Sequence, residues 1–196
     1  MPNDEVAPII HSALKRLEYR GYDSVGIATL FSAGLQIKKD QGKIDDVHKR
    51  LDLNDLNGFI GIGHTRWATH GAPLMVNAHP HTDCEGTIAV VHNGIIENFA
   101  ELKEELVNKG HVIASRTDTE VIPHLIEDNI QQGQNLTESI RNALDRLEGS
   151  YALAILANGE MSLKTDGRYH GRLHLESGEG QAQLDFKLPT EKTQLT

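Results

Sequence analysis

Helical and strand-like patterns of apolar residues alternate along most of this chain. Apolar positions recur every three or four residues in five segments, which predicts amphipathic helices over 3–18, 43–53, 99–109, 117–132 and 136–147. Apolar or β-branched runs predict strands over 25–31, 35–38, 59–62, 87–92, 111–114 and 151–157. Several of these strands are apolar throughout, as is typical of sheets covered on both faces. We therefore expect layered α and β structure.

The pattern changes after residue 160. Apolar content thins, glycines become frequent, and two alternating strands are expected over 172–176 and 181–188 around a Ser-Gly-Glu-Gly turn. No motif stands out in this part. We divide the chain into a domain of residues 1–160 and an unassigned tail, a β-hairpin candidate, of residues 161–196.

Composition narrows the class of protein. With 196 residues, 38% of them apolar and 24% charged, the chain can bury a real core. A net charge of −9 argues against nucleic acid or an anionic membrane as partner, and no apolar run approaches the ~20 residues that span a bilayer. The acidic start does not resemble a signal peptide. Cys84 is the only cysteine, which excludes an intrachain disulfide and favours the cytoplasm.

The segment 61–71 (Gly-Ile-Gly-His-Thr-Arg-Trp-Ala-Thr-His-Gly) is the first candidate for chemistry. It follows a predicted buried strand, and polar loops at strand ends are common ligand sites. Arg66 stays charged and requires an anionic partner. The alternative is a surface loop in which Arg66 makes an ordinary ion pair.

Two further segments have both a plain and a functional interpretation. Asn93-Gly94 follows a predicted strand and is typical of a hairpin turn, yet an Asn amide beside a Gly N–H also makes a two-donor oxyanion hole. Asp118 could cap the following helix. It could equally bind the amino group of an amino acid whose carboxylate is held by Arg66, so that the two residues recognise a zwitterion.

We expect no metal and no cofactor. Histidines are dense between residues 64 and 92, but neither a thiolate nor a carboxylate completes a recognisable ligand spacing: His64, His70, His79, His81 and His92. Cys84 lies between Asp83 and Glu85, whose charges disfavour a thiolate. A surface cysteine is therefore favoured over a nucleophile.

Five segments occurring in order resemble one family: residues 17–26, 64–71, 77–81, 91–98 and 117–122. They are similar to the class II glutamine amidotransferase domain of glucosamine-6-phosphate synthases, the glutamine–fructose-6-phosphate aminotransferases. Amidophosphoribosyltransferases share the Arg, Asn-Gly and Asp positions, but their sequences differ where this chain has Glu-Tyr-Arg-Gly-Tyr-Asp and Thr-Arg-Trp-Ala-Thr-His-Gly. An amidotransferase of that type is the alternative resemblance.

The resemblance implies an α+β fold, the four-layer αββα sandwich of N-terminal-nucleophile hydrolases. It implies that Arg66 and Asp118 hold the carboxylate and amine of L-glutamine and that Asn93 and Gly94 form the oxyanion hole. It also implies a loop closing over glutamine that contains Trp67, Thr69 and His70. In the family, ammonia released from glutamine reaches a separate isomerase domain and aminates fructose 6-phosphate.

The chain also departs from the family pattern. The family's nucleophile is an N-terminal cysteine on a short strand before the first helix, whereas this chain begins Met1-Pro2, and the resemblance stops near Gly159. We expect an incomplete sandwich, truncated at both ends, whose exposed strand edges predict marginal stability or self-association. Candidate partners are L-glutamine and a separate isomerase chain.

Three hypotheses follow for activity. The chain is a fragment of an amidotransferase domain by lineage. By itself it is a catalytically inactive remnant that binds glutamine, because the oxyanion hole has no thiolate to assist. In the third hypothesis, Cys84 or a partner chain supplies a substitute nucleophile.

Overall fold

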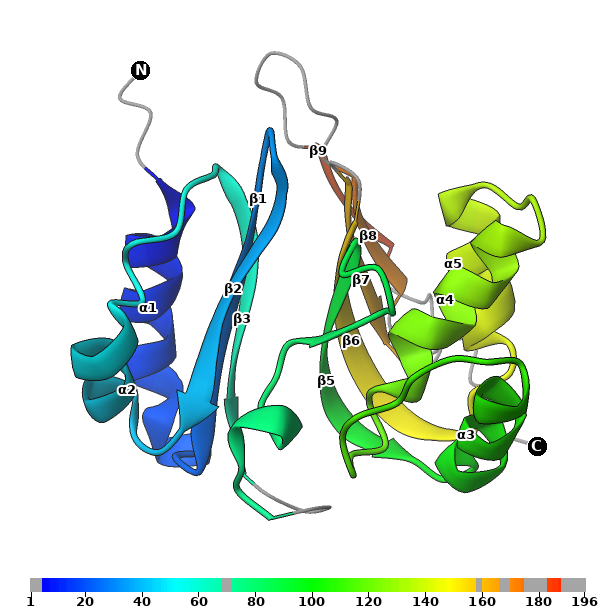
Figure 1. Ribbon diagram of the computed structural model, residues 1–196. Coiled ribbons are helices and arrows are strands. Elements are labelled where there is room, and N and C mark those ends of the chain that lie inside the picture. The colour runs from blue at the N-terminus through cyan, green and yellow to red at the C-terminus, as the bar shows by residue number, and fades with distance from the viewer. Residues whose placement is uncertain (1–4, 68–71, 158–159, 166–169, 175–182, 188–196) are drawn as a thin grey trace, which may run out of the picture.

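The computed structural model describes residues 5–67, 72–157, 160–165, 170–174 and 183–187. Its helices and strands are arranged as two sheets that face each other, each covered by helices on its outer face (Figure 1). The architecture is α+β with four layers in the order α, β, β, α. The family resemblance therefore implied the correct class of fold.

The first sheet has strand order β2-β1-β3 and is antiparallel. Its strands are β1 (Ser24–Phe31), β2 (Gly34–Gln41) and β3 (Ile60–Arg66). Helices α1 (Val6–Leu17) and α2 (Ile44–Leu51) cover its outer face (Figure 1). A short 3-10 turn, Glu18–Arg20, continues α1 toward β1.

The second sheet has strand order β4-β5-β6-β7 and is also antiparallel. Its strands are β4 (His81–Thr82), β5 (Ile88–Ile96), β6 (Gly149–Ala157) and β7 (Glu160–Thr165). Its outer face is covered by α3 (Phe99–Asn108), α4 (Val121–Gln131) and α5 (Leu136–Leu144) (Figure 1). A 3-10 turn, Met75–Asn77, precedes β4.

Three apolar clusters lie between the four layers. One packs α1 and α2 on the first sheet through residues such as Leu14, Ile27 and Val47. A second and larger cluster packs α3 to α5 on the second sheet. The third joins the two sheets and includes Ile62 and Val91. Strands covered on both faces explain the continuous apolar runs in the sequence, because neither face of such a strand meets water.

All five predicted helices are present, and the hairpin of residues 25–38 is confirmed by the pairing of β1 with β2. Helix caps were predicted less well. From the sequence alone, Thr137 is a plausible cap of α5, but the side chain of Asn135 caps it instead, by accepting a hydrogen bond from the Glu138 amide at 2.9 Å. Asp118 does not cap α4, because its carboxylate accepts from the Ile96 amide in β5 at 2.9 Å.

Three local predictions were wrong. Residues 111–114 form no strand and belong to neither sheet. Asn93-Gly94 is not a turn, because both residues continue β5 and lie opposite Ala152 and Tyr151 of β6. The strand predicted to end at residue 62 continues to Arg66, which lies opposite Ser24 of β1. In both strands, pairing with a neighbour extends the element through residues that the local sequence marks as irregular.

In the tail, β8 (His170–His174) and β9 (Gln183–Lys187) pair antiparallel, close to the segments expected to be strands. The division of the chain at residue 160 stays a prediction. Among the described residues, no helix is both long and apolar enough to cross a membrane.

Gly94 provides a test of the β5–β6 pairing. Its φ is +136°, and a Cβ there would lie 2.1 Å from the Ser150 carbonyl oxygen, whereas Gly110 has φ of +99° with nothing within 4 Å. We expect Gly94→Ala to lower the free energy of unfolding by about 2–4 kcal/mol, from backbone strain plus overpacking. Gly110→Ala, the matched control, carries only the φ strain and should cost about 1 kcal/mol. Urea unfolding measures both, and equal losses would contradict the clash.

Candidate glutamine site

A cavity of about 320 Å³ opens where the end of β3 meets β5 and the segment before α4. It is lined by residues from five parts of the chain: Leu14, Leu17, Arg20, Gly63, His64, Thr65, Arg66, Trp67, His79, His92, Asn93, Gly94, Asp118 and Thr119. The volume lies at the lower end of the range for small-molecule sites. Five site residues proposed from the sequence therefore line one cavity: Arg66, Trp67, Asn93, Gly94 and Asp118.

Arg66 is held at the edge of this cavity by its backbone. Its carbonyl accepts from the Asp23 amide at 3.0 Å, and the side chain is only 5% exposed. Gly21 lies against the same peptide group, since a Cβ at Gly21 would be 2.7 Å from the Arg66 carbonyl carbon. Burial lowers the pKa of Arg66, while the charges of Asp118 and Asp23 oppose that shift. A guanidinium stays protonated in a protein, so the cavity holds a fixed positive charge.

Asp118 supplies the opposite charge and is also 5% exposed. Its Oδ2 accepts from the Ile96 amide, and its Oδ1 lies 4.0 Å from Nδ1 of His92. Thr119 is bound to the same imidazole, with 2.9 Å between its Oγ1 and His92 Nδ1. These contacts attach the segment before α4 directly to β5, so the carboxylate has a defined position.

The Asn-Ala-His-Pro-His motif of residues 77–81 forms hydrogen bonds with the segment that carries Asp118. Asn77 accepts from the Arg116 amide at 3.0 Å, and His81 Nε2 lies 3.1 Å from Oγ1 of Thr117. Glu120 completes the support by accepting from the amides of Ala114, at 3.0 Å, and Ser115. The motif therefore helps to position Asp118, and its contacts do not indicate a metal site.

The motif is itself fixed against the first sheet. Lys39 in β2 donates to the carbonyls of Ala78 and Pro80 at 2.8 and 2.7 Å. Burial lowers the pKa of Lys39 to about 8, so the ammonium remains a donor at neutral pH. Gly26 in β1 permits the close approach, because a Cβ there would lie 2.1 Å from the His79 carbonyl oxygen.

Asn93 and Gly94 are exposed residues of β5 at the cavity wall. The sequence suggested Gly94 as a backbone donor of an oxyanion hole. The structure adds a different reason for a glycine at this position, because the β6 backbone occupies the space that a side chain would need. Trp67 stands at the mouth with its side chain 58% exposed and its ring edge-on to Tyr22, with 5.6 Å between centroids. Thr69 and His70 lie outside the described residues.

Sequence reasoning did not assign several residues that line the cavity. Leu14 and Leu17 come from the end of α1 and Arg20 from the 3-10 turn that follows it. The apolar spacing of the two leucines indicated only a buried helix face. His64 and His79 stack with ring centroids 4.4 Å apart. The density of histidines in this stretch was the available signal, although it did not distinguish lining residues from ligands.

Cys84 does not line the cavity. It lies in the turn before β5, whereas Asn93 is five residues along the strand from Ile88, or roughly 17 Å at the usual rise. Burial, a hydrogen bond to Glu127 and the charges of Glu127 and Asp83 raise the pKa of its thiol. A nucleophilic role for Cys84 in this cavity has no geometric support.

The four-layer fold and the buried Arg66–Asp118 cavity define the class as an amidotransferase-type N-terminal-nucleophile fold. Residues 64–168 match the glutamine amidotransferase domain family, and the chain belongs to that family.

Relatives include the glutamine–fructose-6-phosphate aminotransferases (isomerizing) of Methanothermobacter thermautotrophicus, 51% identical over 96% of this chain, and Pyrococcus horikoshii, 52% identical over 94%. The chain spans about a third of their length, 32% and 31%. Because the match to the first of these covers 96% of this chain, it includes most of residues 161–196, in which the sequence showed no recognised motif.

Among solved structures, the glutamine phosphoribosylpyrophosphate amidotransferase of B. subtilis, complexed with ADP and GMP, is similar with a TM-score of 0.73. It is 32% identical, and the match covers 84% of this chain and 36% of that one.

The buried histidines predict acid sensitivity. Burial lowers the pKa of His64 from 6.5 to about 4, with His92 and Arg66 acting in the same direction. The unfolded chain therefore takes up this proton below pH 6.5 but the folded chain only near pH 4. The contribution of neutral His64 to the free energy of unfolding is fully present above pH 6.5 and is lost as the pH falls toward 4. After allowing for the partial exposure of His64, this loss amounts to about 2 kcal/mol.

The measurement is urea unfolding at pH 7 and pH 4.5. His64→Gln should flatten this dependence, whereas His48→Gln on α2, which removes an imidazole elsewhere, should leave its slope unchanged. An equally steep loss in His64→Gln would assign the acid sensitivity to other groups.

Proposed function

We propose that the cavity binds L-glutamine as a zwitterion. The guanidinium of Arg66 holds the α-carboxylate, and the carboxylate of Asp118 holds the α-ammonium group. One observation carries the proposal: two opposite charges, each 5% exposed, line one 320 Å³ cavity that fits a free amino acid. The two side-chain charges are complementary to the two charges of a free amino acid.

Asn93 and Gly94 take the side-chain end of the ligand. Both line the same cavity as the charge pair, so the Asn93 amide and the Gly94 N–H are the donors proposed for the side-chain carbonyl oxygen. Trp67, exposed at the mouth, is proposed to cover the bound ligand together with Thr69 and His70. The assignment of the last two rests on the sequence resemblance.

We propose that the chain is part of an enzyme that uses ammonia released from glutamine to aminate fructose 6-phosphate. The support is about 50% identity to relatives named glutamine–fructose-6-phosphate aminotransferases, against 32% to the phosphoribosylpyrophosphate amidotransferase. The cytoplasm is the proposed location. A separate isomerase chain and self-association stay predictions.

The 196 residues by themselves are proposed to bind glutamine without hydrolysing it. Amide hydrolysis by this route needs a nucleophile beside the oxyanion hole, and the sole thiol of the chain, Cys84, does not line the cavity. This is the inactive glutamine-binding alternative, favoured here by the position of Cys84.

Calorimetric titration with L-glutamine and two analogues tests which residue recognises which group. Glutaramate (5-amino-5-oxopentanoate) lacks the amino group, and 4-aminobutanamide lacks the carboxylate. We expect Asp118→Asn to weaken L-glutamine binding roughly 30-fold, about 2 kcal/mol, because one charge-assisted contact is lost. The same variant should leave glutaramate binding nearly unchanged. Arg66→Lys should weaken the binding of L-glutamine and glutaramate, which carry the carboxylate, and should leave the binding of 4-aminobutanamide unchanged.

Arg66→Lys retains the charge and guards against loss of fold, which circular dichroism checks. The matched control is Arg141→Ala, which removes an exposed arginine from α5. Equal losses for all three ligands in one variant would mean that the variant acts on the fold, and binding unaffected by either variant would sink the zwitterion assignment.

Turnover gives a separate prediction. The unmodified chain and Cys84→Ala should both bind L-glutamine and release no ammonia above background in a coupled glutamate assay. A chain carrying an added Cys-Gly-Ile N-terminus should gain activity. Ammonia release by the unmodified chain that disappears in Cys84→Ala would restore Cys84 as nucleophile.

A further inference from the structure

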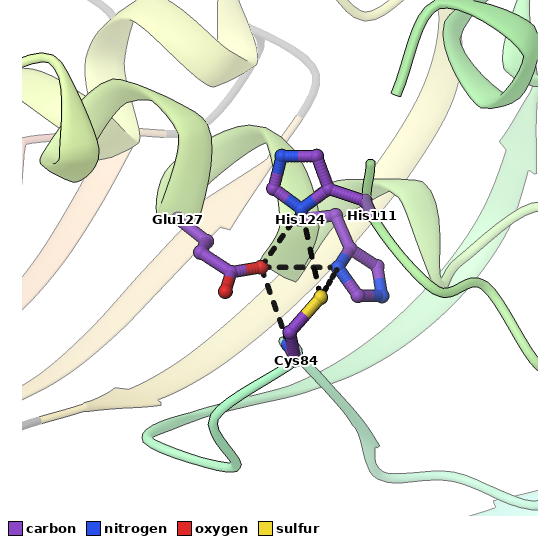
Figure 2. Close-up of side chains that lie close together, drawn as sticks. All are labelled: Cys84, His111, His124 and Glu127. Carbon is purple, nitrogen blue, oxygen red and sulfur yellow. Dashed lines mark hydrogen bonds and ion pairs between the residues drawn. The ribbon is translucent and has the colours of Figure 1, made fainter. Parts of the chain in front are cut away.

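Away from the glutamine cavity, four ligand-type side chains converge on one point (Figure 2). Cys84 comes from the turn between β4 and β5, His111 from the segment after α3, and His124 and Glu127 from successive turns of α4. Their Sγ, Nδ1 and carboxylate atoms all lie within 4.8 Å of one another. The two histidines and the glutamate are buried and Cys84 is exposed, so the cluster is open to solvent on the thiol side.

The separations are close to those of a tetrahedral zinc site. Zn–S bonds of about 2.3 Å and Zn–N or Zn–O bonds of about 2.0–2.1 Å place sulfur and nitrogen about 3.6 Å apart, and nitrogen and oxygen about 3.3 Å apart. Here Cys84 Sγ lies 3.7 and 3.6 Å from Nδ1 of His111 and His124. Glu127 Oε2 lies 2.9 and 3.2 Å from the same two nitrogens.

The same geometry argues against a catalytic Cys–His–Glu triad. In a triad, the imidazole uses one nitrogen for the nucleophile and the other for the carboxylate. In this cluster, each histidine directs a single nitrogen, Nδ1, at both Cys84 and Glu127. Convergence of all four groups through one atom each is what a central cation requires.

The surroundings also suit a metal. His111 Nε2 faces Asp128 Oδ1 at 3.8 Å, a carboxylate placed where outer-shell partners of metal-bound histidines are found. Asp128 is held in turn by Lys109, whose Nζ donates to its Oδ2 at 2.7 Å. Cys84 sits in a turn fixed by Asp83, which accepts from the amides of Thr87 and Ile88 at 2.8 Å.

We propose that Cys84, His111, His124 and Glu127 bind one divalent ion of the zinc class. A thiolate and a carboxylate balance the two charges of the ion, and the two imidazoles bind as neutral ligands. On binding, the thiol proton leaves to solvent and each imidazole carries its proton on Nε2. Four protein ligands close the coordination sphere, so the ion would be structural and would tie the β4–β5 turn to α4 and to the segment after α3.

This proposal departs from the sequence-based expectation of no metal. The four ligands are spread over 44 residues and three separate segments, and no Cys-x-x-Cys or His-x-x-x-His spacing occurs among them to indicate a site. The expectation considered the histidines of residues 64–92, which do not form such a cluster in the described part of the chain.

Cobalt(II) titration of untagged, chelator-treated protein tests the site, because Co²⁺ accepts zinc-type ligand sets. We expect one ion per chain, tetrahedral d–d bands, and a thiolate-to-cobalt charge-transfer band that Zn²⁺ abolishes. Since Cys84 is the only cysteine, that band reports on Cys84 alone. Zn²⁺ should also raise the Tm of the chain.

Cys84→Ser should remove the charge-transfer band and weaken Zn²⁺ binding more than about 100-fold. Asp128→Asn should keep the band and weaken binding roughly 10–100-fold, as expected for an outer-shell partner. His48→Gln, a histidine outside the cluster, should change neither, and L-glutamine binding should be unaffected in Cys84→Ser. Absence of the band in the unmodified chain, or Zn²⁺ affinity equal in Cys84→Ser, would overturn the proposal.

Discussion

The placing of two buried, opposite charges, Arg66 and Asp118, in one cavity depends on one constraint, that both sheets are covered on both faces. Because β3 and β5 belong to different sheets, Arg66 and Asn93 meet only when those sheets pack face to face. The close approach requires Gly26, where any side chain would collide with the His79 carbonyl oxygen. Lys39 then secures the same segment through two carbonyls. The cavity is therefore a consequence of how the layers pack.

The position of Asp118 depends on hydrogen bonds to several other segments of the chain. It lies before α4, yet its carboxylate is bound to the Ile96 amide in β5, and its segment is held by Asn77, His81 and Glu120. These hydrogen bonds fix the position of the buried carboxylate, because they hold both the side chain and the segment that carries it. The histidines that contribute to it are held neutral by burial, which lowers the pKa of His79 and His81 well below 6.5.

The two proposed sites share one connection in the structure. Asp118 and Thr119 precede α4, whereas His124 and Glu127 lie on it, so one helix joins the glutamine cavity to the four-residue cluster. A metal ion bound to the cluster would restrain α4, which directly follows the segment that carries Asp118. Amide chemistry and metal binding would nevertheless remain separate, because the ligand sets have no residue in common.

The sequence by itself determined the kinds of elements and their order, because periodicity reports how many faces of an element are buried. It also indicated the family and five of the residues that line the cavity, through motifs that contain an arginine, a tryptophan, an Asn-Gly pair and an aspartate. Tertiary structure decided what the local sequence leaves open. Asn93-Gly94 forms a strand because β6 pairs with it, and Asp118 binds β5 instead of capping its own helix. Cys84 gained its neighbours His111 and His124 only through folding, since contacts between distant segments leave no periodic trace in the chain.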